Sequence, residues 1–234
     1  HQVKVNGAFA DKPARLVDRG DSIELVGERP RIVSRGGDKL AAALDAFAIE
    51  PEGLRCLDAG ASTGGFTDCL LQRGAAEVVA VDVGYGQLHE ALVGDSRVRN
   101  LERTNIRHLT VADVGGPDDL VVGDLSFISL GAVLQVWEQL ARPGASLVLL
   151  VKPQFEAGKA EASKGKGVIR DPEVWRRVLG DVARAADEAG APVQGARVSP
   201  IRGGSGNVEF LYHLRVGGRR ADVDLDRVID DVGP

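Results

Sequence analysis

Cysteine and aromatic residues are scarce in this sequence. Two of the 234 residues are cysteine, which is too few for a disulfide framework, and Cys56 and Cys69 do not have the spacing of metal ligands. We therefore expect no metal site and a reducing, intracellular setting, which indicates the cytoplasm. Aromatic residues make up 4% of the chain, which argues against a broad platform on which nucleic-acid bases would stack.

Methionine and long apolar runs are also absent. No residue is methionine and the chain begins at His1, so we expect that upstream sequence has been removed or that the chain is a fragment of a longer one. No apolar run approaches the roughly 18 residues that a membrane-spanning helix requires, and no segment has the pattern of a signal peptide. These absences predict a protein that does not span a membrane and has no membrane partner.

An excess of basic residues is missing as well, because the formal net charge is -5. Nucleic-acid-binding proteins usually carry a basic surface, so the global charge argues weakly against RNA binding and any basic contact must be local. The rest of the composition is that of an ordinary globular protein, with 44% hydrophobic and 27% charged residues. The length suits one α/β domain with a small appendage.

The two ends of the chain differ in pattern from its middle. Short strands are expected at residues 3–5 and 23–26, with a turn at Asn6-Gly7. Residues 1–28 cannot bury a core of their own, so we interpret them as the remnant of a larger module; the alternative is a disordered leader with a chance hairpin. Residues 29–35 are charged and broken by Pro30, as in a linker. Residues 218–234 form a polar tail, which is either solvated or contains one short amphipathic helix.

Residues 36–217 alternate between strand and helix patterns. Strands are expected at residues 55–58, 78–83, 98–102, 120–124, 146–152, 193–198 and 208–216. Helices are expected at residues 38–49, 66–73, 87–92, 131–140 and 172–189, the last of them capped by Asp171. This order predicts a doubly wound, Rossmann-like α/β domain with a parallel sheet covered on both faces. The two closing strands have no helix between them, which predicts a final antiparallel strand.

The clearest functional motif lies between the first of these strands and the helix that follows. The strand ends in an acid, Asp58, and a turn of small residues follows, made of Gly60, Ala61, Ser62, Thr63, Gly64 and Gly65. Glycines let the backbone approach a ligand, and the start of a helix offers unpaired N–H groups. The turn also lies at the sheet edge where open α/β sheets bind ligands.

The spacing of this turn separates two kinds of nucleotide ligand. It is not the G-x-G-x-x-G of dinucleotide sites, and a carboxylate at Asp58 would oppose a pyrophosphate on the helix start. An acid suits a cationic or amine-bearing ligand such as S-adenosylmethionine better. Asp82, at the end of the second strand, is placed to bind a ribose. The alternative is a tight turn that binds no ligand.

Four charged residues lie at strand ends or a helix start on the same side of the expected sheet. They are Lys39, Asp124, Lys152 and Glu209. An ammonium at the end of a buried strand is costly unless it is paired, and Lys152 closes a five-residue apolar strand. Each residue alone is more often a solvated rim residue, but two lysines and two acids at one edge together predict a polar site.

Several strings resemble the TlyA family of ribosomal RNA 2'-O-methyltransferases, which has also been labelled haemolysin A. They are SRGGDKL at 34–40, DAGASTGGF at 58–66, DVGYGQL at 82–88, DLSFISL at 124–130, VKPQFE at 151–156 and GNVE at 206–209. The resemblance implies a class I methyltransferase sheet, S-adenosylmethionine as cofactor, and a cytoplasmic monomer. It also implies that the substrate is ribosomal RNA within ribosomal subunits, methylated on the ribose 2'-hydroxyl of cytidine.

The resemblance further implies roles for individual residues. The catalytic set that it implies is Lys39, Asp124, Lys152 and Glu209. The cofactor-binding residues that it implies are Asp58, Gly60, Ala61, Ser62, Thr63, Gly64, Gly65, Asp82, Val83 and Asp124, with Asn105 facing the adenine. No metal is implied.

The family also carries an amino-terminal S4 RNA-binding module. Residues 2–7, 13 and 20–23 resemble the carboxyl-terminal half of such a module, and the helices that usually precede them are absent. We therefore expect a partial S4 domain with little of its basic surface. Contacts to RNA are expected from Arg29, Arg31, Arg35 and the small, basic segment 159–170; the alternative for that segment is a solvated loop.

The implied reaction needs help at the ribose hydroxyl, which is a poor nucleophile. We expect Lys152 to lie nearest to that hydroxyl, where a neutral lysine could accept the proton and a charged lysine could stabilise the alkoxide; both possibilities stay open. Asp124 and Glu209 would orient the lysines. Three other functions are weighed beside this one: methyl transfer to a base or small molecule, a membrane-active haemolysin, and an RNA-binding module whose enzyme domain is inactive.

Overall fold

The computed structural model describes residues 3–10, 15–25, 33–158, 161, 163 and 165–233. The chain divides into two compact units, residues 1–31 and 32–234. The smaller unit contains a three-stranded antiparallel sheet of order β2-β1-β3, formed by β1 (Val3–Val5), β2 (Ala8–Phe9) and β3 (Ile23–Leu25). The Asn6-Gly7 turn has positive φ at both residues, as a tight hairpin requires. β1 and β3 lie where we predicted strands, and β2 was missed.

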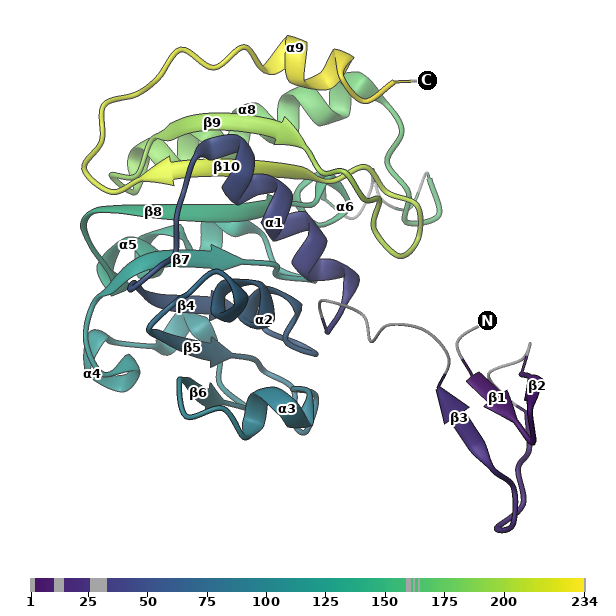
Figure 1. The fold of residues 1–234 in the computed structure, drawn as a ribbon. Coiled ribbons are helices and arrows are strands. Elements are labelled where there is room, and N and C mark those ends of the chain that lie inside the picture. The colour runs from purple at the N-terminus through teal and green to yellow at the C-terminus, as the bar shows by residue number, and fades with distance from the viewer. Residues whose placement is uncertain are drawn as a thin grey trace. The chain divides into compact units, whose positions relative to one another are not determined.

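The larger unit is built on a seven-stranded sheet of order β6-β5-β4-β7-β8-β10-β9 (Figure 1). Its strands are β4 (Arg55–Ala59), β5 (Glu77–Val81), β6 (Val98–Leu101), β7 (Asp118–Gly123), β8 (Ala141–Val151), β9 (Val193–Val198) and β10 (Phe210–Arg215). Neighbouring strands from β6 to β8 are parallel, whereas β10 pairs antiparallel with both β8 and β9. The predicted doubly wound sheet with a final antiparallel strand is therefore confirmed.

Helices cover both faces of this sheet, and two hydrophobic clusters fill the spaces between the layers. One cluster joins the sheet to α1 (Arg35–Phe47), α2 (Gly65–Gln72) and α3 (Glu90–Val93). The other joins it to α4 (Val111–Val114), α5 (Leu134–Leu140), α8 (Pro172–Glu188) and α9 (Leu225–Asp230). Figure 1 shows α1 and α2 in front of the sheet and α5 and α8 behind it. Alternating strand residues supply the two clusters; Leu120 and Val122 face one, and Val121 faces the other.

Several element boundaries differ from the sequence-based expectation. Helix α1 begins at Arg35 rather than Asp38, because the Ser34 side chain caps it by accepting a hydrogen bond from the backbone N–H of Gly36. Glu209 precedes β10 instead of lying within it. The short helices η1 (Ile106–His108), α4 and α6 (Pro153–Glu156) were not predicted, since elements of three or four residues carry no periodic pattern.

The carboxyl-terminal tail packs onto the larger unit rather than being wholly solvated. Helix α9 buries Val228 and Ile229 against the cluster that contains α8. Upstream of it, the side chain of Gln194 on β9 donates to the carbonyl of Arg219 at 2.9 Å. Within the described ranges, none of the helices combines the length and apolar character needed to cross a bilayer, and the same residues contain no group of histidine, cysteine and acidic side chains arranged to hold a metal ion.

Candidate active site

Polar side chains gather at the carboxyl-terminal edge of the parallel strands. Asp82 directly follows β5, Asp124 follows β7 and Lys152 follows β8. The chain runs from β4 outward to β5 and β6 on one side and later to β7 and β8 on the other. Ligands of open α/β sheets bind at the carboxyl edge where the strand order reverses in this way, so the fold places these three residues around one crevice.

The turn between β4 and α2 brings bare backbone against Asp124. Gly60 has a φ of +85°, and a Cβ atom there would lie 2.8 Å from the carbonyl oxygen of Asp124. A glycine is therefore required both by the backbone conformation and by the close approach of the next strand's end. The turn and Asp124 form one rigid floor, from which the crevice opens on both sides.

One side of this floor is a cavity of about 410 Å³ with an apolar wall and two acids, Asp82 and Asp124. The carboxylate of Asp82 accepts hydrogen bonds from the backbone N–H groups of Ser62 at 2.8 Å and Gly84 at 2.7 Å, which fix its orientation. The apolar wall consists of Val81, Val83, Ile106, Leu125, Phe127 and Ile128. Asn105 lines the same cavity, although its side-chain oxygen also accepts from the N–H of Arg107 and caps η1.

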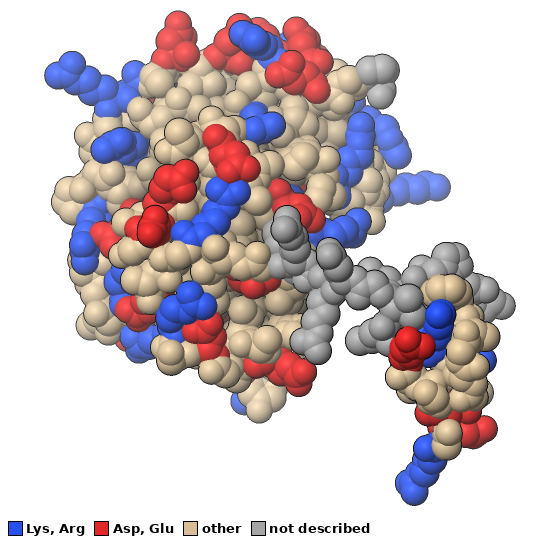
Figure 2. Space-filling model, in the orientation of Figure 1, with Lys and Arg blue, Asp and Glu red and all other residues tan. Residues whose placement is uncertain are grey.

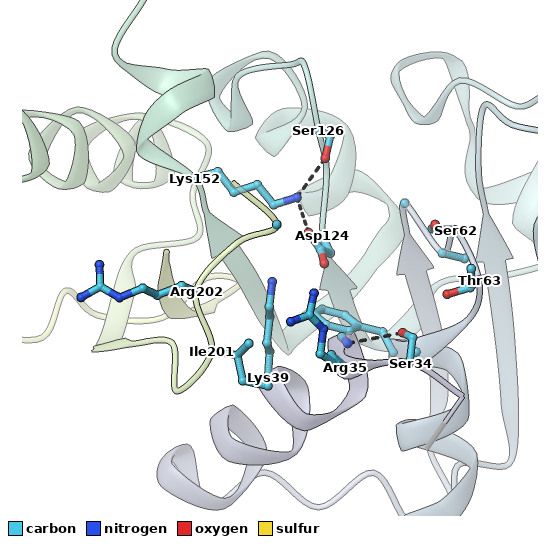
Figure 3. A pocket seen from close by; sticks show the side chains of 16 residues that line it. Ser34, Arg35, Lys39, Ser62, Thr63, Asp124, Ser126, Lys152, Ile201 and Arg202 are labelled. Carbon is cyan, nitrogen blue, oxygen red and sulfur yellow. Dashed lines mark hydrogen bonds and ion pairs between the residues drawn. The ribbon is translucent and has the colours of Figure 1, made fainter. Parts of the chain in front are cut away.

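The other side is a cavity of about 310 Å³ that is lined by basic side chains (Figure 3). It shares Gly60, Ser62, Asp124 and Ser126 with the first cavity, so the two adjoin across the floor. Its further lining includes Arg35 and Lys39 from α1, Lys152 after β8, and Arg202 from the loop between β9 and β10. We call it the lysine cavity and the first one the Asp82 cavity.

Each of the two lysines is paired with a carboxylate. The Lys152 ammonium lies 2.5 Å from Asp124 Oδ1 and donates to Ser126 Oγ at 3.0 Å. Lys39 donates to Glu209 Oε2 at 2.6 Å, and the Glu209 side chain is 3% exposed. Burying an ammonium costs several kcal/mol, on the order of the desolvation free energy of the charge, unless a carboxylate pairs with it. The four predicted residues are therefore brought together, with Glu209 behind Lys39 rather than on the cavity wall.

Asp58 lies beneath the turn and lines neither cavity. Its side chain is fully buried, and Oδ2 accepts a 2.7 Å hydrogen bond from Thr67 Oγ1, while among the described residues Oδ1 has no hydrogen-bond partner. Burial raises the pKa of this carboxyl to about 7. Gly64 is likewise absent from both cavity walls. The other predicted turn residues, Gly60, Ala61, Ser62, Thr63 and Gly65, line the lysine cavity.

Two phenylalanines were missed in the sequence, Phe127 on the wall of the Asp82 cavity and Phe155 near Lys152. Phe127 is 89% exposed and adopts a φ of +65°. Its ring centroid lies 4.9 Å from that of Phe155, and the Lys152 ammonium lies 5.8 Å from the centroid of Phe155. A low aromatic content had argued against a broad stacking platform, but this argument does not address one exposed ring. The signal available in the sequence was that Phe127 lies only three residues after Asp124.

Glu156 joins the two segments that carry these groups. It accepts hydrogen bonds from Ser129 Oγ at 2.6 Å and from the backbone N–H of Leu130 at 2.8 Å. The pKa of Glu156 is raised by burial. Because Glu156 ends α6 and its partners end the Asp124 loop, the contact fixes Lys152 and Phe155 relative to Asp124 and Phe127.

The residues expected to contact RNA are only partly described. Arg35 lines the lysine cavity, and Lys166 and Arg170 are exposed without lining it. Arg29, Arg31, Lys159 and Lys164 lie outside the described residues. Over the face of the larger unit in Figure 2, basic and acidic side chains are interspersed. A basic surface is therefore local, as on the wall of the lysine cavity.

Comparison with known proteins gives a consistent picture. A family model described as FtsJ-like methyltransferase matches residues 32–216. The 16S/23S rRNA (cytidine-2'-O)-methyltransferase TlyA of Mycobacterium tuberculosis is 52% identical over 221 residues, 94% of this chain and 82% of that protein. A solved structure described as a hemolysin from Streptococcus thermophilus is 42% identical, with a TM-score of 0.86 over 98% of this chain and 85% of that one. An S-adenosylmethionine-dependent methyltransferase from Mesorhizobium loti, 18% identical, shares the fold with a TM-score of 0.55 over 76% of this chain and 97% of that one.

Proposed function

The chain belongs to the FtsJ-like methyltransferase family, and we propose that it transfers a methyl group from S-adenosylmethionine to the ribose 2'-hydroxyl of a cytidine in ribosomal RNA. One observation carries the ribose assignment. Two lysine–carboxylate pairs, the half-buried Lys152–Asp124 and the buried Lys39–Glu209, meet at a cavity that adjoins the Asp82 cavity across Gly60. Charged groups held in this way stabilise negative charge that develops on an attacking oxygen.

The residues of the Asp82 cavity fit S-adenosylmethionine. Asp82 keeps acceptor capacity for ribose hydroxyls beyond its two backbone N–H partners, and the apolar wall around Ile106 and Val83 suits an adenine ring. Asn105 lies on that wall as a polar partner for the ring edge. The reactive end would lie at Gly60 and Asp124, which line both cavities. When bound, the cofactor supplies an electrophilic methyl group and leaves as a neutral thioether.

Lys152 acts at the ribose hydroxyl in this proposal. Its ammonium is held by Asp124 Oδ1 and Ser126 Oγ, so it points at the junction of the two cavities, where the hydroxyl oxygen must approach the methyl carbon. As an ammonium, Lys152 stabilises the negative charge that grows on the oxygen while the O–H proton departs to water. A neutral Lys152 would instead accept that proton itself. Lys39, anchored by Glu209, adds a second positive charge. Alignment by these fixed groups lowers the entropy cost of the displacement.

Phe127 is the proposed contact for the target base. A ribose at Lys152 brings its base past the junction of the two cavities, where the exposed Phe127 ring, on the wall of the Asp82 cavity, lies against Phe155. Unstacked bases of RNA are commonly held on exposed aromatic rings. This contact favours a nucleotide that has left its helix, as enzymes acting inside folded RNA require.

The ribosomal substrate rests on the relatives. The 52% identical protein is named for both 16S and 23S RNA and for cytidine. We extend that substrate to this chain, with a cytoplasmic, monomeric enzyme acting on ribosomal subunits. The sheet of β1, β2 and β3 is assigned to a partial S4 domain that contacts RNA outside the active site.

The test is methyl transfer from labelled S-adenosylmethionine to unmodified small and large ribosomal subunits, followed by mapping of the modified nucleotide. The expected product is a 2'-O-methylcytidine. A methyl group on the base, or transfer to small molecules with RNA inert, would contradict the proposal. Subunits already methylated at the mapped ribose serve as the control and should accept no further label.

Substituting Lys152 tests the proposed mechanism. Lys152→Met keeps the apolar stem and removes the ammonium, so the maximal rate of transfer should fall about a hundredfold or more, with cofactor affinity nearly unchanged. Arg184→Met removes an exposed cation on α8, outside the cavities, and is the matched control. Near-normal transfer by Lys152→Met at saturating RNA and cofactor would contradict the assignment of Lys152 to the ribose hydroxyl.

A further inference from the structure

The four cations that line the lysine cavity fall into two classes. Lys39 and Lys152 each contact a buried or half-buried carboxylate. Arg35 and Arg202 are exposed, and among the described residues neither guanidinium has a carboxylate or hydrogen-bond partner. The two lysines are therefore neutralised within the protein, whereas the two arginines remain available to an anion from outside.

Arg202 also belongs to a third cavity, of about 650 Å³, beside the edge strand β9. This β9 cavity is lined by the end of α1, by β9 and the loop after it, and by the carboxyl-terminal tail; its walls include Phe47, Arg197, Ser199 and Val232. Figure 3 shows the Arg202 side chain directed away from Lys39. Because Arg202 lines both cavities, the β9 cavity and the lysine cavity meet at its side chain.

The β9 cavity contains a second arginine with unused hydrogen-bonding capacity. Arg197 donates through one terminal nitrogen to the carbonyl of Ala42 at 3.1 Å, but within the described part of the chain its buried Nε has no hydrogen-bond partner. One acid, Asp231, also lines this cavity. Guanidinium groups bind phosphate through paired N–H donors more readily than ammonium groups do, so the chemistry of this wall suits phosphodiesters.

The loop that carries Arg202 is fixed to the catalytic residues. A Cβ atom on Gly203 would lie 2.5 Å from Glu209 Oε1, so glycine is required where the loop passes the carboxylate that holds Lys39. The backbone N–H of Gly203 donates to the carbonyl of Asn207 at 2.9 Å. Arg202 therefore has a defined place next to the Lys39–Glu209 pair, and a phosphate bound there would lie at a fixed distance from the reacting ribose.

We infer that Arg202 binds a phosphate of the RNA strand that carries the target ribose, and that this strand continues into the β9 cavity towards Arg197. The inference rests on the proposed function and names a binding path that extends its site. The phosphate contact positions the strand without reading its sequence. Arg35, which also lines the lysine cavity, binds the strand where it leaves that cavity.

The first experiment compares Arg202, in the loop after β9, with Arg219, whose backbone lies near the start of β9. Arg202→Gln removes the proposed phosphate contact, and Arg219→Gln removes an exposed arginine whose carbonyl contacts Gln194 near the start of β9. Binding to unmodified ribosomal subunits is measured by co-sedimentation over a range of salt concentrations. Arg202→Gln should weaken binding about tenfold at low salt and flatten the logarithmic salt dependence by about one unit.

Arg219→Gln should change neither quantity, and cofactor affinity, measured by calorimetry, should be the same in both variants. Equal effects of the two substitutions on RNA binding would overturn the inference. So would an unchanged salt slope for Arg202→Gln, or a parallel loss of cofactor affinity, which would show a structural role. Binding is read without turnover, so absence of methyl transfer by the unsubstituted chain would count against the proposed reaction and not against this contact.

A second experiment locates the strand. Both native cysteines are buried, so a cysteine introduced by Pro200→Cys, on the wall of the β9 cavity, can be alkylated selectively. Ribosomal subunits should protect it, while a cysteine introduced by Glu188→Cys on the exposed face of α8 should react at the same rate with and without them. Equal alkylation of both cysteines in the presence of subunits would exclude RNA from the β9 cavity.

Discussion

At the scale of single residues, Asp58 links burial to pH. Its pKa is raised to about 7 by burial, against an ordinary value of 3.8 in the unfolded chain. Between these values the folded protein holds a proton that the unfolded chain releases, so the contribution of this group to stability is present at low pH and is lost as pH rises through about 7. Asp58→Asn removes that titration and keeps an acceptor for Thr67.

We expect the free energy of unfolding of Asp58→Asn to fall less between pH 4 and about 7 than that of the unsubstituted chain, by roughly 1–3 kcal/mol. Chemical denaturation across this range measures the difference. Asp118 has a similarly raised pKa but titrates in both proteins, so it cancels in the comparison. Parallel pH profiles for the two proteins would contradict the raised pKa of Asp58.

At the scale of elements, Glu156 holds α6 to the loop that follows β7. Glu156→Ala removes both acceptors, those of Ser129 and Leu130; Phe127 and Lys152 should then lose their relative alignment. The maximal rate of transfer should fall about tenfold, with little change in cofactor affinity. Glu156→Gln keeps an acceptor for the Leu130 N–H and should restore most of the rate.

Hydrogen exchange at the Leu130 amide separates this positioning role from a general loss of stability. Exchange there should accelerate in Glu156→Ala and recover in Glu156→Gln, while amides of the central strand β4 stay protected. Glu173→Ala, at the exposed start of α8, is the control. A rate loss that tracks the melting temperature across these variants would refute a positioning role.

The same elements show what the sequence could and could not reveal. Strand β5 and the Asp171 cap of α8 were predictable, because an apolar run bounded by turn signals and a capping residue before proline are local patterns. The contact of Glu156 with Ser129 and the pairing of Lys39 with Glu209 join residues 27 and 170 positions apart. No local pattern encodes such contacts. Arg202 was passed over for the same reason, since its meaning depends on where a loop lies in the folded chain.

At the scale of the whole larger unit, the proposed cofactor and RNA sites lie over different strands of the sheet. The Asp82 cavity is built largely on β5 and β7, whereas the β9 cavity is built on α1, β9 and the tail. Asp124 and the lysine cavity lie between them. Disturbing the tail should therefore affect RNA binding and stability while sparing the cofactor.

Ile229→Ala tests this separation. The side chain is 5% exposed and packs with α9 against the cluster that contains α8, so the free energy of unfolding should fall by about 2 kcal/mol. RNA affinity should fall because α9 supports Asp231 and Val232 on the wall of the β9 cavity. Cofactor affinity should change less than about twofold, since no residue of the described tail lines the Asp82 cavity and distant sites are usually independent.

Val93→Ala, at an exposed valine on α3, is the control and should alter none of the three quantities. Cofactor affinity is measured by calorimetry well below the melting temperature of the variant. If cofactor affinity fell together with RNA affinity, the two sites would not be independent and the proposed separation would be wrong.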